Sequence, residues 1–146
     1  MSRIKDNQED FINRQIEERL RQALSEKNIS VSFEYELSNT NYNPNGIKDK
    51  NDRLKFYTEL IEKLKIMSGK TWKDLGKESK RTGYESIPYK QFEKGIQVSF
   101  KNINIISPDS KLDVIRVTSE YRMIGKYLNG IYYIIGYDIS FSAYGH

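Results

Sequence analysis

The C-terminal third of the chain constrains the fold more than any other part. The tetrapeptide 128–131, Leu-Asn-Gly-Ile, places Asn-Gly between two apolar runs. Asn-Gly favours a type I′ turn, because both central residues of that turn need positive φ angles. We therefore expect strands at 121–128 and 131–140 to form a hairpin, with a third strand at 112–118. The last strand is apolar on both faces, which indicates a central strand that is covered on both sides.

The first half of the chain contains helical spacing. Residues 8–27 have an apolar stripe and a charged face, which predicts an amphipathic helix. Residues 52–67 predict a second helix, capped by Asn51 or Asp52. Thr71 begins a short third helix. The stripe expected to bury the second helix consists of Leu54, Tyr57, Ile61 and Leu64.

Three further segments separate these elements. Residues 29–37 alternate apolar and polar side chains, which indicates a half-exposed strand. Residues 38–51 are rich in asparagine and predict a loop. Residues 81–95 predict irregular structure. The alternation of Ile96, Val98 and Phe100 favours a strand, which the sequence does not assign to the sheet.

This order of elements predicts an α+β fold, with helices packed on one face of a small antiparallel sheet. We expect residues 29–146 to form one compact domain. Residues 1–28 would be an additional N-terminal helical extension.

The composition excludes several classes of site. Among the 146 residues there is no Cys and a single His, His146, so disulfides and thiolate metal sites are ruled out. We expect no metal and no cofactor. No run approaches the roughly 20 apolar residues of a membrane span, and the N-terminus lacks a secretory signal. The expected location is cytoplasmic, with no membrane partner.

The positive charge of the chain is concentrated in its middle. The net charge is +4 overall, whereas residues 48–81 carry 11 basic against 6 acidic side chains, a net of +5. A polyanion such as RNA would be attracted to this segment. The alternative interpretation is a lysine-rich helix surface that is merely solvated.

Polar side chains near the C-terminus form the candidate chemical site. They are Arg116, Arg122, Lys126, Tyr144 and His146. Arginine can hold a phosphate by paired hydrogen bonds, and Tyr144 or His146 could transfer a proton. RNA cleavage by its own 2′-hydroxyl needs a base, an acid and charge stabilisation, which this group could supply. The alternative is that the cations only line the wet face of the sheet.

From residue 29 onward, the order strand–helix–helix–meander resembles that of the RelE/YoeB-like bacterial toxins, small ribosome-associated mRNA interferases. The segment 117–136, VTSEYRMIGKYLNGIYYIIG, is similar to the toxin segment in which an acidic and an aromatic residue precede an Arg. Arg122 falls where those toxins keep a catalytic arginine. The resemblance implies proton transfer by Tyr144 and His146. The substrate phosphates would be held by Arg116, Lys126 and Tyr121.

Uncharacterised toxin-like proteins of the same layout are a closer likeness. The segments VSFEYEL and FYTELIEKLKIMSGKTWKDL resemble their first strand and paired helices. The matching positions near the C-terminus are Arg122, Gly125, Asn129, Tyr132 or Tyr133, Asp138 and Tyr144. Phe141 stands where these relatives have a histidine, so acid–base chemistry would depend on His146 instead. The helix at 8–27 and the length of 81–111 are also additional.

Three functional hypotheses follow. The first is a RelE-like toxin that cleaves mRNA without a metal, acts at the ribosome and is held by an antitoxin. The second is a non-catalytic binding module, such as a phage or mobile-element protein, that acts on a host protein or ribonucleoprotein. The third is a homodimer formed through the 8–27 helix.

Overall fold

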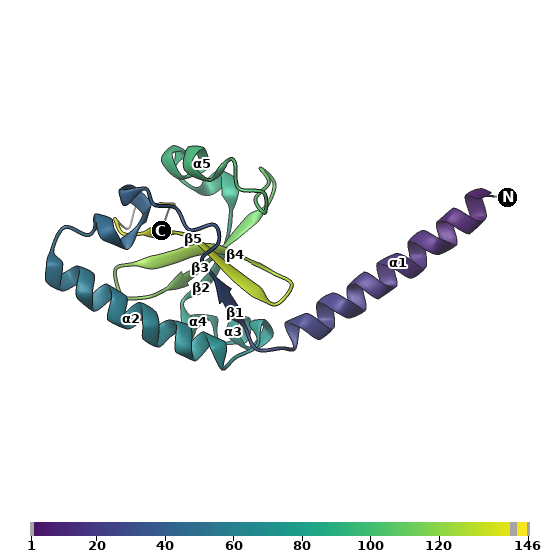
Figure 1. Ribbon diagram of the computed structural model, residues 1–146, viewed down its shortest axis with the longest axis horizontal. Coiled ribbons are helices and arrows are strands. Elements are labelled where there is room, and N and C mark those ends of the chain that lie inside the picture. Colours follow the sequence, from purple (N-terminus) through teal and green to yellow (C-terminus); the bar gives the residue numbers. More distant parts are fainter. Residues whose placement is uncertain (1, 141–142, 146) are drawn as a thin grey trace.

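The structure, a computed structural model, describes residues 2–140 and 143–145 (Figure 1). Its main elements in chain order are α1 (Ser2–Ser25), β1 (Ser30–Ser32), α2 (Lys50–Ser68), α3 (Trp72–Lys77), α4 (Ser79–Thr82), β2 (Tyr84–Pro88), α5 (Lys94–Phe100), β3 (Lys111–Arg116), β4 (Arg122–Leu128) and β5 (Ile131–Asp138). The α+β class predicted from the sequence is confirmed. Among the described residues, none of the helices is long and apolar enough to cross a membrane.

The five strands form one sheet in the order β1-β5-β4-β3-β2. The predicted hairpin is confirmed: Leu128 pairs with Ile131, and Asn129 and Gly130 have φ angles of 50° and 87°. All neighbouring strands are antiparallel except β1, which runs parallel to β5. The sheet is therefore mixed. Between the parallel neighbours β1 and β5, the chain passes through helices α2–α5 and strands β2–β4.

Both faces of the sheet are covered, whereas the sequence predicted helices on one face only. Helices α2, α3 and α4 lie on one side, and α5 with the C-terminal tail lies on the other (Figure 1). Tyr132 and Ile134 of β5 point into the core beneath α2, and Ile135 points into the core beneath α5. The expectation that the last strand is buried on both faces is confirmed, and this double burial is why a second covering layer is needed. We call the two sides the α2 face and the α5 face.

Helix α2 buries a row that only partly overlaps the predicted one, since Tyr57 and Leu64 pack against the core as predicted. Phe56, Leu60 and Met67 are buried, whereas the predicted core residues Leu54 and Ile61 are 67% and 53% exposed. Lys63 occupies the buried row and is only half-exposed, and its Nζ donates to the carbonyl of Thr82 at 2.9 Å. The apolar stem of a lysine can pack inside a protein. Because a charged residue interrupts the row, the sequence pattern did not indicate that this row is buried. The N-cap is also shifted, since the Asp49 side chain accepts from the Asp52 amide.

The middle of the chain differs from the sequence prediction in two further places. Residues 94–100 form helix α5 rather than a strand, and the edge strand β2 lies inside the segment 81–95 that was expected to be irregular. Ile96 and Phe100 are buried in the helix. They would also share one face of a strand, because residues i and i+4 lie on the same face in both structures. Only Val98, which is 62% exposed, distinguishes the two.

The predicted strand at 29–37 is regular only over β1. Ile29 and Val31 pack on the α2 face, and then a turn between Phe33 and Glu36 carries the chain across the sheet edge. Beyond the turn, Tyr35 and Leu37 pack on the α5 face. The alternation therefore serves two different cores rather than one.

Helix α1 begins near the chain's N-terminus and extends away from the rest of the protein (Figure 1). Its apolar side chains Phe11, Ile12, Ile16 and Leu20 are all more than half exposed. Only its last turn touches the body, where Leu24 lies beside Gly130 of the hairpin.

Candidate functional site

Arg122 begins strand β4 and belongs to the α5 face. Met123 points into the α2-face core and Ile124 into the α5-face core, so alternation places Arg122 on the α5 face. Its register partner on β5 is Asp138, whose side chain is 1% exposed. Arg122 itself is half-buried. A cation and a buried carboxylate therefore lie opposite each other at this end of the sheet.

The C-terminal tail folds back over the same end of the α5 face. The Glu93 amide donates to the carbonyl of Ala143 at 2.7 Å. Tyr144 forms an isolated antiparallel β-bridge with Phe92, and the centroids of their rings are 5.4 Å apart. The buried Tyr144 hydroxyl donates to Glu85 Oε2 at 2.5 Å. The tail thus joins a residue of the edge strand β2 to the region of Arg122.

The surroundings of Tyr144 raise the pKa of its hydroxyl. Burial is the largest cause, the hydrogen bond and charge of Glu85 add to it, and Arg122 opposes it. Asp138 raises this pKa further. Because the hydroxyl holds its proton against Glu85, it is a fixed donor at neutral pH and not a base. We name Glu85, Arg122, Asp138 and Tyr144 the Arg122 cluster.

The structure brings Arg122 and Tyr144 into one cluster, as predicted, but places three other predicted residues elsewhere. Tyr121 lies on the α2 face, with its ring 5.8 Å from that of Phe56. Lys126 Nζ donates to the carbonyl of Lys111 at 2.8 Å. It lies four residues from Arg122 along β4, which is about 13 Å at the usual rise of a strand.

Arg116 is the register partner of Arg122 on β3, yet its side chain lies over the neighbouring edge of the sheet. A Cβ added to Gly83 would lie 2.9 Å from Arg116 Nε and 3.2 Å from Cζ. Gly83 also has a φ of 67°, so a glycine suits this position for two reasons. The predictions for His146 and for Phe141 fall outside the residues that the structure describes.

Two members of the Arg122 cluster were not singled out as chemical residues by the sequence. Glu85 lies in a segment that was expected to be irregular, and Asp138 ends an apolar strand. An acid at the end of a strand that is buried on both faces was a usable signal for Asp138, because a buried carboxylate needs partners.

A second polar region surrounds the turn at Thr82–Gly83, directly before strand β2. Lys63 reaches the carbonyl of Thr82, and Arg116 covers Gly83. The pKa of Lys63 is lowered by burial first, and then by the charges of Arg116 and Lys70. Lys70 is bound to Glu78. Positive charges therefore converge at this turn.

Helices α3 and α4 add further cations at the same turn. The exposed ones are Lys73, Lys77, Lys80 and Arg81. In the part of the chain that the structure describes, none of these four forms an ion pair. We name these four residues, with Lys63 and Arg116, the basic corner.

A surface hollow of about 630 Å³ lies at the N-terminal end of α2. Its polar lining includes Asp49, Asp52 and Glu93, and Tyr121 forms part of its wall. Burial raises the pKa of Tyr121, and the charges of Glu120, Asp52 and Asp49 raise it further. These three carboxylates outweigh the one lysine of the lining, Lys48, and would repel a phosphate, so this hollow does not suit RNA. Within residues 2–140 and 143–145, no three Asp, Glu or His side chains are grouped as a metal site requires.

No protein-family model, no curated protein and no solved structure matches this chain. The resemblance to RelE/YoeB-like toxins stays a prediction from the sequence.

Proposed function

We propose that this protein is an RNA-binding domain that holds phosphates on its basic corner. The observation that carries the proposal is the set of exposed cations on α3 and α4 that have no acidic partner within the described residues. Binding of RNA depends largely on cations that neutralise phosphates and release counterions. Helices α3 and α4 present such cations to solvent.

The lowered pKa of Lys63 supports the same region. Arg116 and Lys70 destabilise the charged form of Lys63, in addition to burial. An RNA phosphate placed among these cations would relieve their mutual repulsion, and the pKa of Lys63 would rise on binding. The acidic hollow beside Tyr121 and the carboxylates of the Arg122 cluster offer no comparable attraction.

The proposal is tested by fluorescence anisotropy with single-stranded and hairpin RNA over a salt series. The test variant is Lys77→Gln with Lys80→Gln. The matched control is Lys94→Gln with Lys101→Gln, which removes the same charge from exposed residues at the opposite side of the sheet. We expect the test variant to reduce the salt dependence of log K by about 0.7–0.9 for each lost phosphate contact. Equal weakening by both pairs would contradict a localised site.

Cleavage of mRNA in the manner of RelE-like toxins is the second candidate. It is favoured by the position of Arg122, half-buried on a sheet face beside Tyr144. In such a reaction the guanidinium would stabilise the charge that develops on the phosphate. The raised pKa of Tyr144 makes it a donor and not a base, so the base would have to be another group.

This candidate is tested by cell-free translation with a ribosome-bound reporter mRNA. Arg122→Lys is the better variant, because it keeps a positive charge opposite the buried Asp138 and loses the paired hydrogen bonds of arginine. Lys94→Gln with Lys101→Gln is again the control, because both lysines are exposed and neither is a predicted site residue. Message cleaved by the parent and by this control, but not by Arg122→Lys, would support a nuclease. Intact message with all three proteins would rule out cleavage, and RNA binding would be the one remaining proposal.

A further inference from the structure

Two helices present rows of apolar side chains to solvent. On α1 the row consists of Ile12, Ile16 and Leu20, which are 53%, 57% and 58% exposed. On α2 it consists of Leu54 and Ile61, which are 67% and 53% exposed. Exposed apolar side chains that lie in a row along a helix can form an interaction surface.

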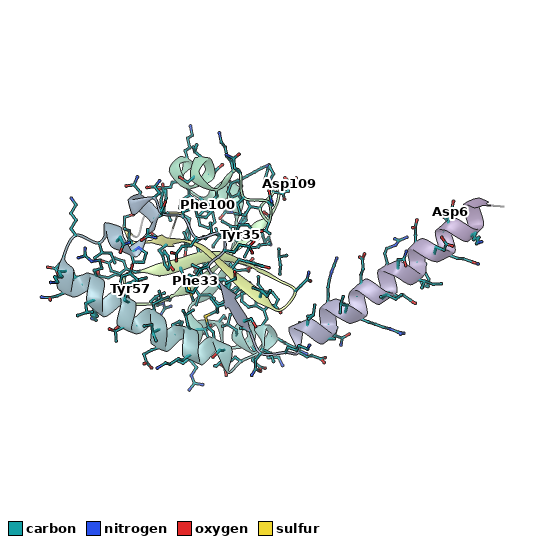
Figure 2. The ribbon with its side chains drawn as sticks, viewed as in Figure 1. Asp6, Phe33, Tyr35, Tyr57, Phe100 and Asp109 are labelled. Carbon is teal, nitrogen blue, oxygen red and sulfur yellow. The ribbon has the colours of Figure 1, made fainter. Side chains whose placement is uncertain are left out.

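Helix α1 does not reach the row on α2 of its own chain. Its connection to the body is held in place: Asn28 bridges to Thr71, and the Ile29 amide donates to the carbonyl of Lys70 at 2.9 Å. From there α1 points away from the body, and Asp6 lies at its far end (Figure 2). An isolated helix is marginally stable in water, so packing of the exposed row on a partner would stabilise α1.

The two rows have complementary spacing. The row on α1 follows every fourth residue, whereas Leu54 and Ile61 alternate with the half-buried Tyr57 and Leu64 at steps of three and four. Apolar rows that repeat every three to four residues allow two helices to pack along their length at a crossing angle of about 20°.

The charges of the two helices match in one orientation only. Residues 5–13 of α1 carry one basic and three acidic side chains, a net of −2, whereas residues 14–25 carry three basic and two acidic, a net of +1. Residues 50–58 of α2 carry three basic and one acidic, a net of +2, and residues 59–68 carry two of each. Opposite charges therefore meet when the N-terminal halves of the two helices lie together, that is, when the helices are parallel.

The fold provides this orientation for two copies of the chain. The C-terminal ends of α1 and α2 both approach the same place, where Asn28 meets Thr71. A two-fold axis near that place lays α1 of each copy along α2 of the other, with the N-terminal ends together. Such an interface is isologous, so each helix contact is formed twice.

We infer that the protein forms a two-fold dimer in which α1 of each copy packs lengthwise on the outward row of α2 of the other. The inference rests on the apolar rows of α1 and α2 and does not depend on RNA binding. It differs from a dimer in which the two α1 helices pair with each other.

The dimer is tested by measuring the solution mass of the full chain by light scattering over a concentration series. Ile16→Asp on α1 and Ile61→Asp on α2 should each raise the dissociation constant by about a hundredfold or more, because a buried unpaired charge costs several kcal/mol. Val98→Asp is the control, since Val98 is 62% exposed on α5. It should leave the mass unchanged. Both test positions are exposed in the single chain, and circular dichroism checks that the body of each variant is folded.

Mixing the two variants separates the alternatives. The chain with Ile16→Asp keeps an intact α2, and the chain with Ile61→Asp keeps an intact α1. Their mixture should therefore regain a dimer through one of the two contacts. A dimer that survives Ile61→Asp but not Ile16→Asp would overturn the inference in favour of pairing between α1 helices. A parent protein that stays monomeric at every concentration would overturn it outright.

Discussion

The buried polar groups on the two faces of the sheet are covered by different kinds of structure. On the α2 face, Asp113 accepts from the Tyr84 hydroxyl at 2.8 Å and from the Tyr127 amide at 2.8 Å. Trp72 stacks on Tyr127, with ring centroids 4.2 Å apart. The acid is enclosed by strands and by a helix, and both of its oxygens are hydrogen-bonded.

On the α5 face the polar groups lie at the end of the sheet and are covered by the C-terminal tail. Tyr144 and Glu85 join the tail to the edge strand, and Asp138 lies opposite Arg122. Regular elements cover the first polar group and an irregular segment covers the second. Asp113 therefore lies inside the regular part of the fold, whereas the Arg122 cluster lies at its margin, beneath the tail residues 143–145.

The largest expected effect tests whether both faces are true cores. Phe56→Ala on the α2 face and Phe100→Ala on the α5 face each remove a fully buried ring. Each should lower the free energy of unfolding by about 3–5 kcal/mol, measured by urea denaturation. A negligible loss of stability for Phe100→Ala would show that α5 does not belong to the cooperatively folded core.

Asp113→Ala tests the enclosed polar group. The change leaves the Tyr84 hydroxyl and the Tyr127 amide without their acceptor, and an unsatisfied buried donor costs about 1–3 kcal/mol. Urea denaturation should therefore show a clear loss of stability, beyond that of Tyr84→Phe alone. Equal losses for the two variants would mean that the Tyr127 amide finds water instead.

Tyr144→Phe tests the polar group under the tail. It removes the hydrogen bond to Glu85, which is itself exposed and can be hydrated, so we expect a loss of about 0.5–1.5 kcal/mol. RNA affinity should be unchanged, because Tyr144 is not part of the basic corner. A large loss of affinity would transfer the binding site to the Arg122 cluster.

The smallest expected effect concerns the pH dependence of the free energy of unfolding. Burial raises the pKa of Asp113 above its usual value, although hydrogen bonds from Tyr127 and Tyr84 and the charge of Lys126 oppose the shift. The folded state therefore binds the proton more tightly than the unfolded state, whose Asp titrates near about 3.9. The resulting stabilisation is full below that pH and is lost as pH rises through the folded pKa. Urea midpoints should show this component in the parent and not in Asp113→Ala; identical pH profiles would contradict it.

Much of the fold could be predicted where the cause is local. The hairpin follows from Asn129-Gly130, since few other residues adopt the positive φ angles of that turn. Burial of β5 on both faces follows from its unbroken apolar run, and the start of α3 follows from Thr71, whose side chain accepts from the Asp74 amide. The distribution of charge among the segments is likewise a property of the sequence.

Local patterns did not decide which of two equivalent rows is buried. Helix α2 has helical spacing in both of its apolar rows, and the row that contains Lys63 is the buried one, with Lys63 Nζ hydrogen-bonded to the carbonyl of Thr82. Ile96 and Phe100 fit a strand and a helix equally well. In both places the choice depends on what packs against the segment.

The secondary structure of the C-terminal meander, the α+β class and the places where charge accumulates were therefore predictable, because these depend on neighbouring residues. Which side chains meet depends on the tertiary structure. Glu85 and Tyr144 are 59 residues apart, and Arg122 and Tyr121 are adjacent but lie on opposite faces. Strand register and the path of the tail set these contacts, and both result from long-range packing that no short pattern encodes.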